Sequence, residues 1–325
     1  MSDERECDLS ILIVSYNTRD LTVAAIESVF RFPPDRPFEL IVLDNASSDG
    51  SAEAIAERFG GRVRLIAHQT NVGFAAGNNI AAQSATGRQL LLLNPDTLVL
   101  DGTLTNILDF ARRQPQRRIW GGRTLFPDHS LNPTSCWRRL TLWSLFCSAT
   151  GLTYMFPRSR LFNSEAYGDW ARDSEADVDI VTGCFLLIDH DFWARLRGFD
   201  PTFFMYAEEA DLCLRAAAAG ARPGITPTAQ LVHYGGASEV TRTEKVITTM
   251  RGRITLMRKH WSTAAYVAGR GLLLLWAFSR MVASRVLSGP QDNPGQSHQK
   301  WSEIWARRAE WLVAYPIVTD GRADP

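Results

Sequence analysis

One acidic residue of this 325-residue chain, Asp96, follows an apolar run closely and is a candidate for binding or catalysis. Four consecutive leucines at 90–93 precede Asn94, Pro95 and Asp96. Such a run is typical of a strand buried on both faces of a sheet, and α/β proteins bind ligands beyond the carboxyl ends of their strands. We therefore expect Asp96 at the edge of a binding site, although an acid after a strand can also serve only as a turn former.

A second group of acids, Glu208, Glu209 and Asp211, follows the aromatic stretch at 203–206. The helix dipole favours acids in the first turn of a helix, so a purely structural role is one interpretation. Asp211 in particular could pair with Arg215, four residues further on. An aromatic loop that excludes water would also raise the pKa of a nearby carboxyl group, as a general base requires. The sequence leaves both interpretations open.

Polar turns also follow the other apolar runs in the N-terminal part of the chain. They carry Ser15, Tyr16 and Asn17, then Asp44, then Asn71, Gly73 and Asn78, and finally Asn94. Because the carboxyl ends of parallel strands share one edge of a sheet, we expect these turns to line one crevice. Turn formation alone would explain each of them. Together they favour a nucleotide pocket, in which Tyr16 stacks on a base and Asp44 accepts hydrogen bonds from the base or ribose.

The commoner phosphate-binding motifs are absent from the sequence, which has neither a G-x-G-x-x-G after its first apolar run nor a P-loop. A diphosphate bound here would therefore need another counter-charge. A divalent cation, Mg²⁺ or Mn²⁺, held by Asp96 would supply it, because hard cations bind carboxylate and phosphate oxygens together. His233, which Gly235 and Gly236 follow, is a candidate contact to the metal or diphosphate, or else an ordinary polar group.

Charge and cysteine content exclude several classes of protein. Lys plus Arg and Asp plus Glu both number 35, so no net charge attracts nucleic acid and we expect no nucleic-acid partner. The five cysteines are scattered without a C-x-x-C pair, which indicates reduced thiols rather than a disulfide framework or structural zinc. The polar N-terminal stretch carries no secretory signal, so we expect a cytoplasmic protein.

The turns belong to a regular alternation of elements. Strands are expected at 9–14, 39–43, 63–67 and 90–93, with helices at 20–30 and 51–59 and a third that ends near 85. This order predicts an α/β fold with a mostly parallel sheet, right-handed crossovers and helices on both faces. Residues 120–177 have weak periodicity, so we expect them to be irregular, partly helical and acceptor-facing. Residues 179–188 predict a strand pair or a bent strand, and 229–233 a short strand.

The C-terminal part, 241–325, is expected to be a helical region. Residues 264–286 are apolar, but Arg270, Arg280 and Arg285 interrupt them, so this stretch is too short to span a membrane. It is either a buried or oligomer-forming helix, or an amphipathic helix that seats the protein on the inner face of the cytoplasmic membrane with Trp276 and Phe278 inserted. The sequence does not decide between homo-oligomer contact and peripheral membrane contact.

Taken in order, these motifs resemble those of the inverting glycosyltransferases of family 2, which have the GT-A (Rossmann-like) fold, and especially the bacterial rhamnosyltransferase-like branch. The resemblance covers about residues 8–240. It rests on VSYNT at 14–18, VLDNASSDGS at 42–51, NVGFAAGNN at 71–79 and LNPDT at 93–97, and is completed by residues 198–215 and 233–238. It implies a nucleotide-binding half at about 8–120 and an acceptor half at about 121–240.

The resemblance also implies roles for individual residues. Tyr16 and Asp44 would recognise the nucleoside, and Asp96 would be the retained acid of the family's D-x-D metal motif. His233 would contact the metal or diphosphate, and Glu209 would be the catalytic base. The sequence departs from the family pattern twice, because Asn94 replaces the first acid of D-x-D and Glu209 replaces an aspartate.

Further contacts expected of such a site are Ser15, Asn17, Asn71, Gly73, Asn78 and Asn94 for the nucleotide-sugar, and Glu208, Gly183 and Asp211 for the acceptor. The expected reaction is metal-dependent inverting transfer of a sugar to a hydroxyl of a cell-envelope glycan or lipid-linked acceptor. The expected donor is dTDP-L-rhamnose, or alternatively a UDP-sugar. Two other functions stay open on the sequence: a sugar nucleotidyltransferase, and a non-catalytic glycan-binding protein with the same fold.

Overall fold

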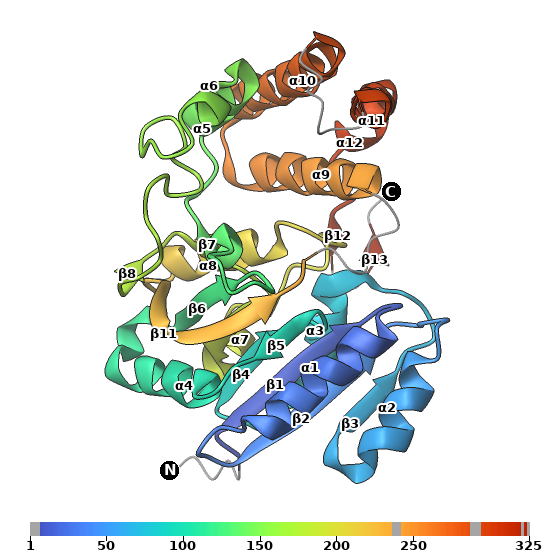
Figure 1. Ribbon diagram of the computed structural model, residues 1–325, viewed down its shortest axis with the longest axis vertical. Helices are drawn as coiled ribbons and strands as arrows, with labels where there is room; N and C mark the ends of the chain where they lie inside the picture. Colours follow the sequence, from blue (N-terminus) through green and yellow to red (C-terminus); the bar gives the residue numbers. More distant parts are fainter. Residues whose placement is uncertain (1–6, 236–241, 287–293, 320–321, 324–325) are drawn as a thin grey trace. The chain divides into compact units, whose positions relative to one another are not determined.

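The computed structural model describes residues 7–235, 242–286, 294–319 and 322–323 (Figure 1). The chain divides into two compact units. The first comprises residues 1–137, 171–204 and 208–238, and the second comprises 138–170, 205–207 and 239–325. The second unit therefore takes in residues 138–170, which the sequence grouped with the acceptor half.

The first unit is built on a nine-stranded sheet in the order β3-β2-β1-β4-β10-β6-β11-β5, with β8 paired to β11. Its strands are β1 (Leu9–Ser15), β2 (Phe38–Asp44), β3 (Arg64–Ala67), β4 (Gln89–Leu93), β5 (Thr97–Val99), β6 (Ile119–Leu125), β8 (Ala176–Asp177), β10 (Phe185–Asp189) and β11 (Gly224–His233). Strands β1 to β4 run parallel to one another, whereas β10 is antiparallel to both β4 and β6. The mostly parallel α/β sheet predicted from the sequence is confirmed.

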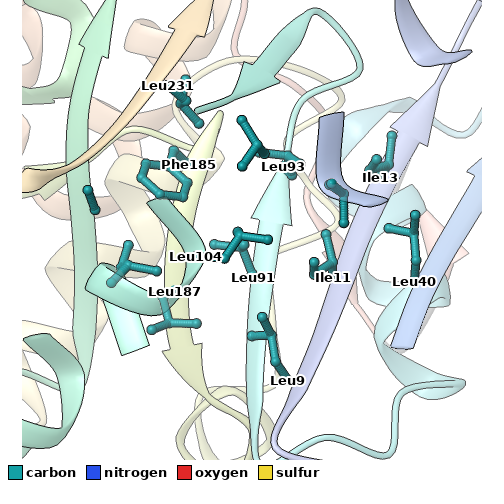
Figure 2. Close-up of a cluster of buried hydrophobic side chains, with 14 of the residues drawn as sticks. Leu9, Ile11, Ile13, Leu40, Leu91, Leu93, Leu104, Phe185, Leu187 and Leu231 are labelled. Carbon is teal, nitrogen blue, oxygen red and sulfur yellow. The ribbon is translucent and has the colours of Figure 1, made fainter. Parts of the chain in front are cut away.

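Helices cover both faces of this sheet (Figure 1). They are α1 (Arg19–Arg31), α2 (Ser51–Phe59), α3 (Gly73–Gln83), α4 (Thr103–Arg113), α7 (His190–Arg195) and α8 (Glu208–Ala218). On one face, alternate residues of β1, β2, β4 and β10 form a core with α1, α2 and α4 (Figure 2). On the other, Gly77 of α3 lies against Val14 and Leu43, where an added Cβ would be 3.0 Å from Val14. The leucine run in β4 is buried on both faces, as its sequence predicts.

Strand β6 lies inside the stretch for which the sequence predicts irregular structure, and that prediction is wrong here. Its residues Gly121 and Gly122 have no side chain to give an apolar pattern. The structure supplies the reason for both glycines. An added Cβ at Gly121 would be 2.5 Å from Val181, and one at Gly122 would meet the Ala229 carbonyl and the Phe185 ring. The neighbouring elements come too close for any larger residue. A short two-stranded ladder, β7 (Cys136–Trp137) with β9 (Ile180–Val181), follows.

The second unit is mainly helical, as predicted for the C-terminal region. It contains α5 (Leu142–Thr150), α6 (Leu152–Met155), α9 (Arg242–His260), α10 (Thr263–Val286), α11 (Pro294–Ala306), α12 (Arg308–Trp311), and the short strands β12 (Val318–Thr319) and β13 (Arg322–Ala323). Its core joins Leu140 and Leu145 to apolar residues of α9 to α12, including Ile254 and Trp311. Within the described residues, no helix combines the length and apolar character that crossing a bilayer would require.

The structure shows how part of α10 packs against its neighbouring helices. Trp276 packs edge-on against Trp301 of α11, with 5.1 Å between the ring centroids. Trp276 is partly buried against the helical core, as the packing interpretation expects, and its insertion into a membrane stays a prediction. Phe278 packs against Trp305 at 5.4 Å but remains 44% exposed. The side of α10 that carries Leu273 and Ala277 is buried, as the packing interpretation expects.

Candidate functional site

The turns that follow β1 and β2 are joined by side chain to backbone hydrogen bonds. Asn17, at φ 51°, accepts a hydrogen bond from the Ser48 amide at 2.8 Å, and its own amide donates to Ser47 Oγ at 3.0 Å. Ser15 is fully buried and hydrogen bonds to Thr22 Oγ1 at 2.8 Å. Ser15 and Asn17 thus shape the turns, and between them Tyr16 is half-buried at the carboxyl end of β1.

Asp44 combines one satisfied and one open carboxylate oxygen. Its Oδ2 accepts a hydrogen bond from the Ser47 amide at 3.0 Å. Its Oδ1 is buried and has no hydrogen-bond partner within the described chain. A buried carboxylate oxygen without a donor is unfavourable unless a ligand supplies one. The geometry therefore allows Asp44 to accept a hydrogen bond from a ligand.

The side chain of Asn45 connects the β2 turn to the start of α3. Its Oδ1 accepts from the Val72 amide at 2.9 Å, and its Nδ2 donates to Asn71 Oδ1 at 2.9 Å and to the Gly73 carbonyl at 3.2 Å. Asn71 Oδ1 in turn accepts from the Gly73 amide at 2.9 Å. These two amides therefore fix the backbone at the N-terminus of α3.

Helix α3 holds the aromatic loop in front of α8. Gly73 has φ 83°, and an added Cβ there would collide with the Phe204 carbonyl, which accepts a hydrogen bond from the Phe74 amide at 2.8 Å. Asn79 forms two bonds to Phe199, accepting from its amide at 2.9 Å and donating to its carbonyl at 2.8 Å. Asn78, by contrast, donates to the Phe74 carbonyl within its own helix.

Asp96 and His233 lie together, although they are far apart in the sequence. His233 Nε2 is 3.3 Å from Asp96 Oδ1, and both side chains are largely buried. Cys184 lies beside the imidazole, and its carbonyl accepts from the Asn94 amide at 3.1 Å. Asn94 Oδ1 and His233 Nδ1 are buried polar atoms without a hydrogen-bond partner in the described part of the chain. Burial opposes protonation of His233, but Cys184 and Asp96 raise its pKa to about 11.

This pair can contribute to a cation site but cannot complete one alone. Among the described residues there is no group of three or more His, Cys, Asp or Glu side chains that could hold a metal ion. Mg²⁺ commonly takes one or two carboxylates from the protein and its other ligands from substrate phosphates and water. A carboxylate and an imidazole next to the open Asn94 oxygen fit such a shared site. Gly236, the second glycine after His233, lies outside the described residues.

The acids at the start of α8 occupy different environments. Glu208 is only 4% exposed, and its Oε2 has no hydrogen-bond partner in the described ranges. Burial, together with the neighbouring charge of Glu209, raises the pKa of Glu208 well above its usual value. Glu209 is half-buried, and an added Cβ at Gly183 would be 3.6 Å from Glu209 Cβ. Gly183 and Glu209 are therefore close together.

Asp211 has the structural partner that the sequence offered as an alternative to acceptor contact. Its fully buried carboxylate accepts from Arg215 Nε at 2.7 Å. Arg215 also donates to the carbonyls of Leu196 at 2.6 Å and Gly198 at 2.9 Å. Because Asp211 is fully buried, it does not face an acceptor in this structure. It orients Arg215, which ties α8 to the turn after α7.

Sequence reasoning overlooked Asn45 and Asn79 as residues that position the site, and it named Arg215 only as a partner for Asp211. Each lies within or beside a recognised motif, but its partner is a backbone group that the sequence does not identify. Buried asparagine near a helix start was the available signal, because an amide removed from water requires hydrogen-bond partners. The structure brings Asp96 together with His233, and Gly183 together with Glu209, as neighbours.

The sheet and the helices that flank it have a GT-A-like fold. The fold is similar to the mannosyltransferase PcManGT from Pyrobaculum calidifontis, solved in complex with GDP-Man and Mn²⁺, with a TM-score of 0.57, 17% identity, and 95% of this chain and 88% of that one covered. S. aureus TarS 1–349 gives a TM-score of 0.51 at 15% identity, with 94% and 83% covered. At these identities, the likeness concerns the fold alone.

The sequence comparison identifies a family domain within the N-terminal part of the chain. Residues 10–169 match the model described as Glycosyl transferase family 2, so the chain carries a glycosyl transferase family 2 domain. It is 26% identical over 211 residues to N-acetylglucosaminyl-diphospho-decaprenol L-rhamnosyltransferase of Mycobacterium tuberculosis, covering 62% of this chain and 67% of that protein. It is 28% identical over 233 residues to rhamnosyltransferase WbbL of Escherichia coli K12, covering 69% and 82%. The predicted glycosyltransferase class is thus confirmed.

The role of Asp211 can be tested by Asp211→Asn. This change leaves Arg215 without its buried counter-charge, so we expect the free energy of unfolding to fall by about 3 kcal/mol. Nucleotide binding should be retained at temperatures where the variant is folded. Urea unfolding measures the first effect and calorimetric titration of nucleotide diphosphates the second. The matched control is Asp169→Asn, which breaks the solvent-exposed Arg160–Asp169 pair and should leave stability nearly unchanged. Equal stability of the two variants would contradict the positioning role.

Proposed function

We propose that this chain is a metal-dependent inverting glycosyltransferase that moves L-rhamnose from dTDP-L-rhamnose to a hydroxyl of a cell-envelope glycan or lipid-linked acceptor. A sugar from a UDP-sugar is the alternative donor. The observation that carries the proposal is the arrangement of acids around one edge of the sheet. Asp44 is the last residue of β2, Asp96 follows β4 and faces His233, and Glu209 lies in the first turn of α8 beside Gly183. The names of the bacterial relatives support rhamnose and a polyprenyl diphosphate-linked acceptor.

Residues 8–120 would form the nucleotide-binding half. In this proposal the open Oδ1 of Asp44 accepts a hydrogen bond from the base or ribose, and Tyr16 supplies a ring for stacking. Asn17, Asn45 and Asn71 hold the turns in place through the hydrogen bonds described above. Residues 121–240 would supply the acceptor side, with Gly183 leaving room beside Glu209.

Asp96 and His233 would hold Mg²⁺ or Mn²⁺, with Asn94 nearby. The bound cation would stabilise the negative charge that develops on the leaving diphosphate. This assignment is supported by the 3.3 Å approach of the two side chains and by their burial. The raised pKa of His233 favours the protonated imidazole beside Asp96, whereas metal binding would require the neutral imidazole.

Glu209 would act as the general base. It would take the proton from an acceptor hydroxyl while that oxygen attacks the anomeric carbon from the side opposite the diphosphate. The carbon–oxygen bond to the diphosphate then breaks, and its electron pair leaves with the diphosphate. Glu208 suits a different task, because its raised pKa keeps the carboxyl protonated more readily and able to donate a hydrogen bond. It would orient the acceptor hydroxyl.

Replacing Glu209 by Gln tests the base and the enzymatic function together. The amide keeps the size of the side chain but cannot take a proton, so we expect turnover to fall by about 10²–10⁴-fold. Donor affinity should change little, because Asp44 and Asp96 are unaltered. Radiolabelled sugar transfer and calorimetric donor titration measure the two quantities. Glu209→Asp should be milder, since aspartate is the usual family residue at this position.

Glu208→Gln is the matched control for this experiment. It should reduce transfer less than Glu209→Gln, because a protonated carboxyl and an amide can both donate a hydrogen bond. Normal transfer by Glu209→Gln combined with lost transfer by Glu208→Gln would identify Glu208 as the base instead. Release of pyrophosphate from a nucleoside triphosphate and a sugar phosphate would favour the nucleotidyltransferase alternative. Wild-type protein without transfer or donor hydrolysis would favour a glycan-binding role.

Asp96→Asn tests the cation site. The amide preserves the shape of the carboxylate but removes its charge, and we expect Mg²⁺ or Mn²⁺ to stop strengthening the binding of nucleotide diphosphates. Calorimetry with and without each metal gives the comparison. Asp101→Asn, at an exposed position five residues further on, should keep the wild-type metal dependence. A metal effect that survives unchanged in Asp96→Asn would remove Asp96 from the proposed site.

We propose further that the protein works in the cytoplasm and that its second unit contacts the inner face of the cytoplasmic membrane, where a lipid-linked acceptor would be found. Val267, Leu275, Phe278 and Val282 are 40–61% exposed and recur at helical spacing on one face of α10. Helix α6 adds Tyr154 and Met155, which are 77% and 66% exposed. Residues 138–164 and 263–286 contain arginines and no Asp or Glu. Exposed apolar side chains with only cations among them suit an anionic lipid surface.

Vesicle binding tests this contact. Serine at Val267, Leu275 and Val282 together should weaken binding to vesicles containing anionic lipid by more than about tenfold, because all three apolar contacts are lost. Wild-type binding should also weaken as salt is raised. Serine at Val313 and Ile317, which are 59% and 52% exposed in the same unit, is the matched control. A wild-type protein that ignores such vesicles would instead favour the oligomer interpretation of α10, measurable by light scattering.

A further inference from the structure

The backbone directly before the acidic pair of α8 adopts an uncommon conformation. Tyr206 and Ala207 have φ angles of 67° and 73°, in the left-handed region. Residues that carry a Cβ seldom adopt this conformation, and two in succession require support from their surroundings. Because Ala207 is bonded to Glu208, the path of these two residues sets where α8 begins. Whatever holds them therefore also sets the position of the acidic pair.

That support comes from a glycine in α9. An added Cβ at Gly252 would be 2.5 Å from the Tyr206 carbonyl oxygen and 3.1 Å from its carbonyl carbon. These are backbone atoms, which cannot rotate out of the way as the end of a side chain can. Gly252 is buried, and glycine is disfavoured in the middle of a helix, so its place in α9 calls for a packing reason. The close approach of Tyr206 provides one.

The other end of the same segment is held in a similar way. The Phe204 carbonyl accepts a hydrogen bond from the Phe74 amide at 2.8 Å, and Gly73 leaves the space beside it. The Phe204 contact belongs to the first unit, whereas residues 205–207 belong to the second unit together with α9. Two backbone carbonyls of the segment, two residues apart, are therefore each fixed against a glycine.

We propose that Gly252 is a positioning residue for Glu208 and Glu209: by admitting the Tyr206 carbonyl against α9, it fixes the left-handed segment from which α8 starts. Its effect on catalysis rests on the proposed function, in which Glu209 takes the proton from the acceptor. A displaced Tyr206 carbonyl changes the position of that carboxylate but leaves Asp44, Asp96 and His233 untouched. Gly252 therefore affects turnover and not donor binding.

The test compares three glycine to alanine variants in the second unit. Gly252→Ala forces the Tyr206 carbonyl to move. Gly269→Ala also crowds its surroundings, with Met257 and Trp261 side-chain atoms 2.7 Å from the new Cβ, but it does not touch Tyr206. Gly271→Ala lies in α10 with no atom within 4 Å of the new Cβ. The three variants therefore separate the contact with Tyr206 from crowding in general and from the loss of a helical glycine.

Two readouts are taken on each variant below its unfolding temperature. Hydrogen–deuterium exchange of the peptide at 203–209, measured without substrate, should increase only in Gly252→Ala. The kcat for transfer should fall by about 10–100-fold in the same variant, because small displacements of a catalytic group have effects of this size. The dissociation constant of the donor should stay within about twofold of wild type in all three, since the groups proposed to bind it are untouched.

Unchanged exchange at 203–209 in Gly252→Ala overturns the proposal, whatever the activity. An equal fall of kcat in Gly269→Ala, or a parallel loss of donor affinity, overturns it as well. If Gly252→Ala does not fold, Ala207→Val takes its place: a β-branched residue opposes the left-handed conformation at φ 73°, so faster exchange at 203–209 with a lower kcat is expected. Wild-type behaviour of that variant rejects the proposal. Absence of transfer by the wild-type protein counts against the proposed function, and the exchange comparison still decides on the Gly252 contact.

Discussion

The burial of the four leucines of β4 is the constraint on which the rest of the first unit depends. A strand that water reaches on neither face must satisfy its backbone through its neighbours, and β4 does so between parallel β1 and antiparallel β10. The chain order reverses at β1, which pairs with β2 on one side and β4 on the other. Where the strand order reverses, the loops after the two neighbouring strands lead to opposite sides of the sheet, and a crevice forms beyond the carboxyl ends of those strands. Asp96 and its neighbours lie at that edge because β4 ends there.

The hydrophobic pattern of the sequence was sufficient to predict the strands that are formed by continuous apolar runs. The apolar runs at 9–14, 39–43 and 90–93 gave their strands, since burial on both faces leaves little choice of residue. Strand β6 was overlooked because Gly121 and Gly122 remove the side chains from which a strand is recognised. The need for those glycines arises from Val181, Phe185 and Ala229, which approach only in the folded chain. Tertiary contacts of this kind produce no hydrophobic periodicity in the sequence.

In the candidate site, too, some features could be predicted from the sequence and others could not. The order of its polar turns along the chain predicted that they would share one edge of the sheet, because the connectivity of parallel strands imposes it. The amide contacts of Asn45 and Asn79 could not be predicted, since each joins backbone groups whose positions depend on two separate loops. The sequence left the role of Trp276 open because nothing in α10 identifies Trp301 as its packing partner. The role of a side chain is therefore hardest to predict when its partner is distant in the sequence.

The two units are interleaved along the chain, and this limits how such a protein can be recombined. The second unit gathers residues 138–170, 205–207 and 239–325, and the first supplies everything between them. Leu140 and Leu145 share a core with Ile254 and Trp311, more than a hundred residues away. A single crossover between two related genes would therefore pair half of one helical core with half of another. Exchange of this unit as a module has to carry three stretches together, so divergence within them is expected to be correlated.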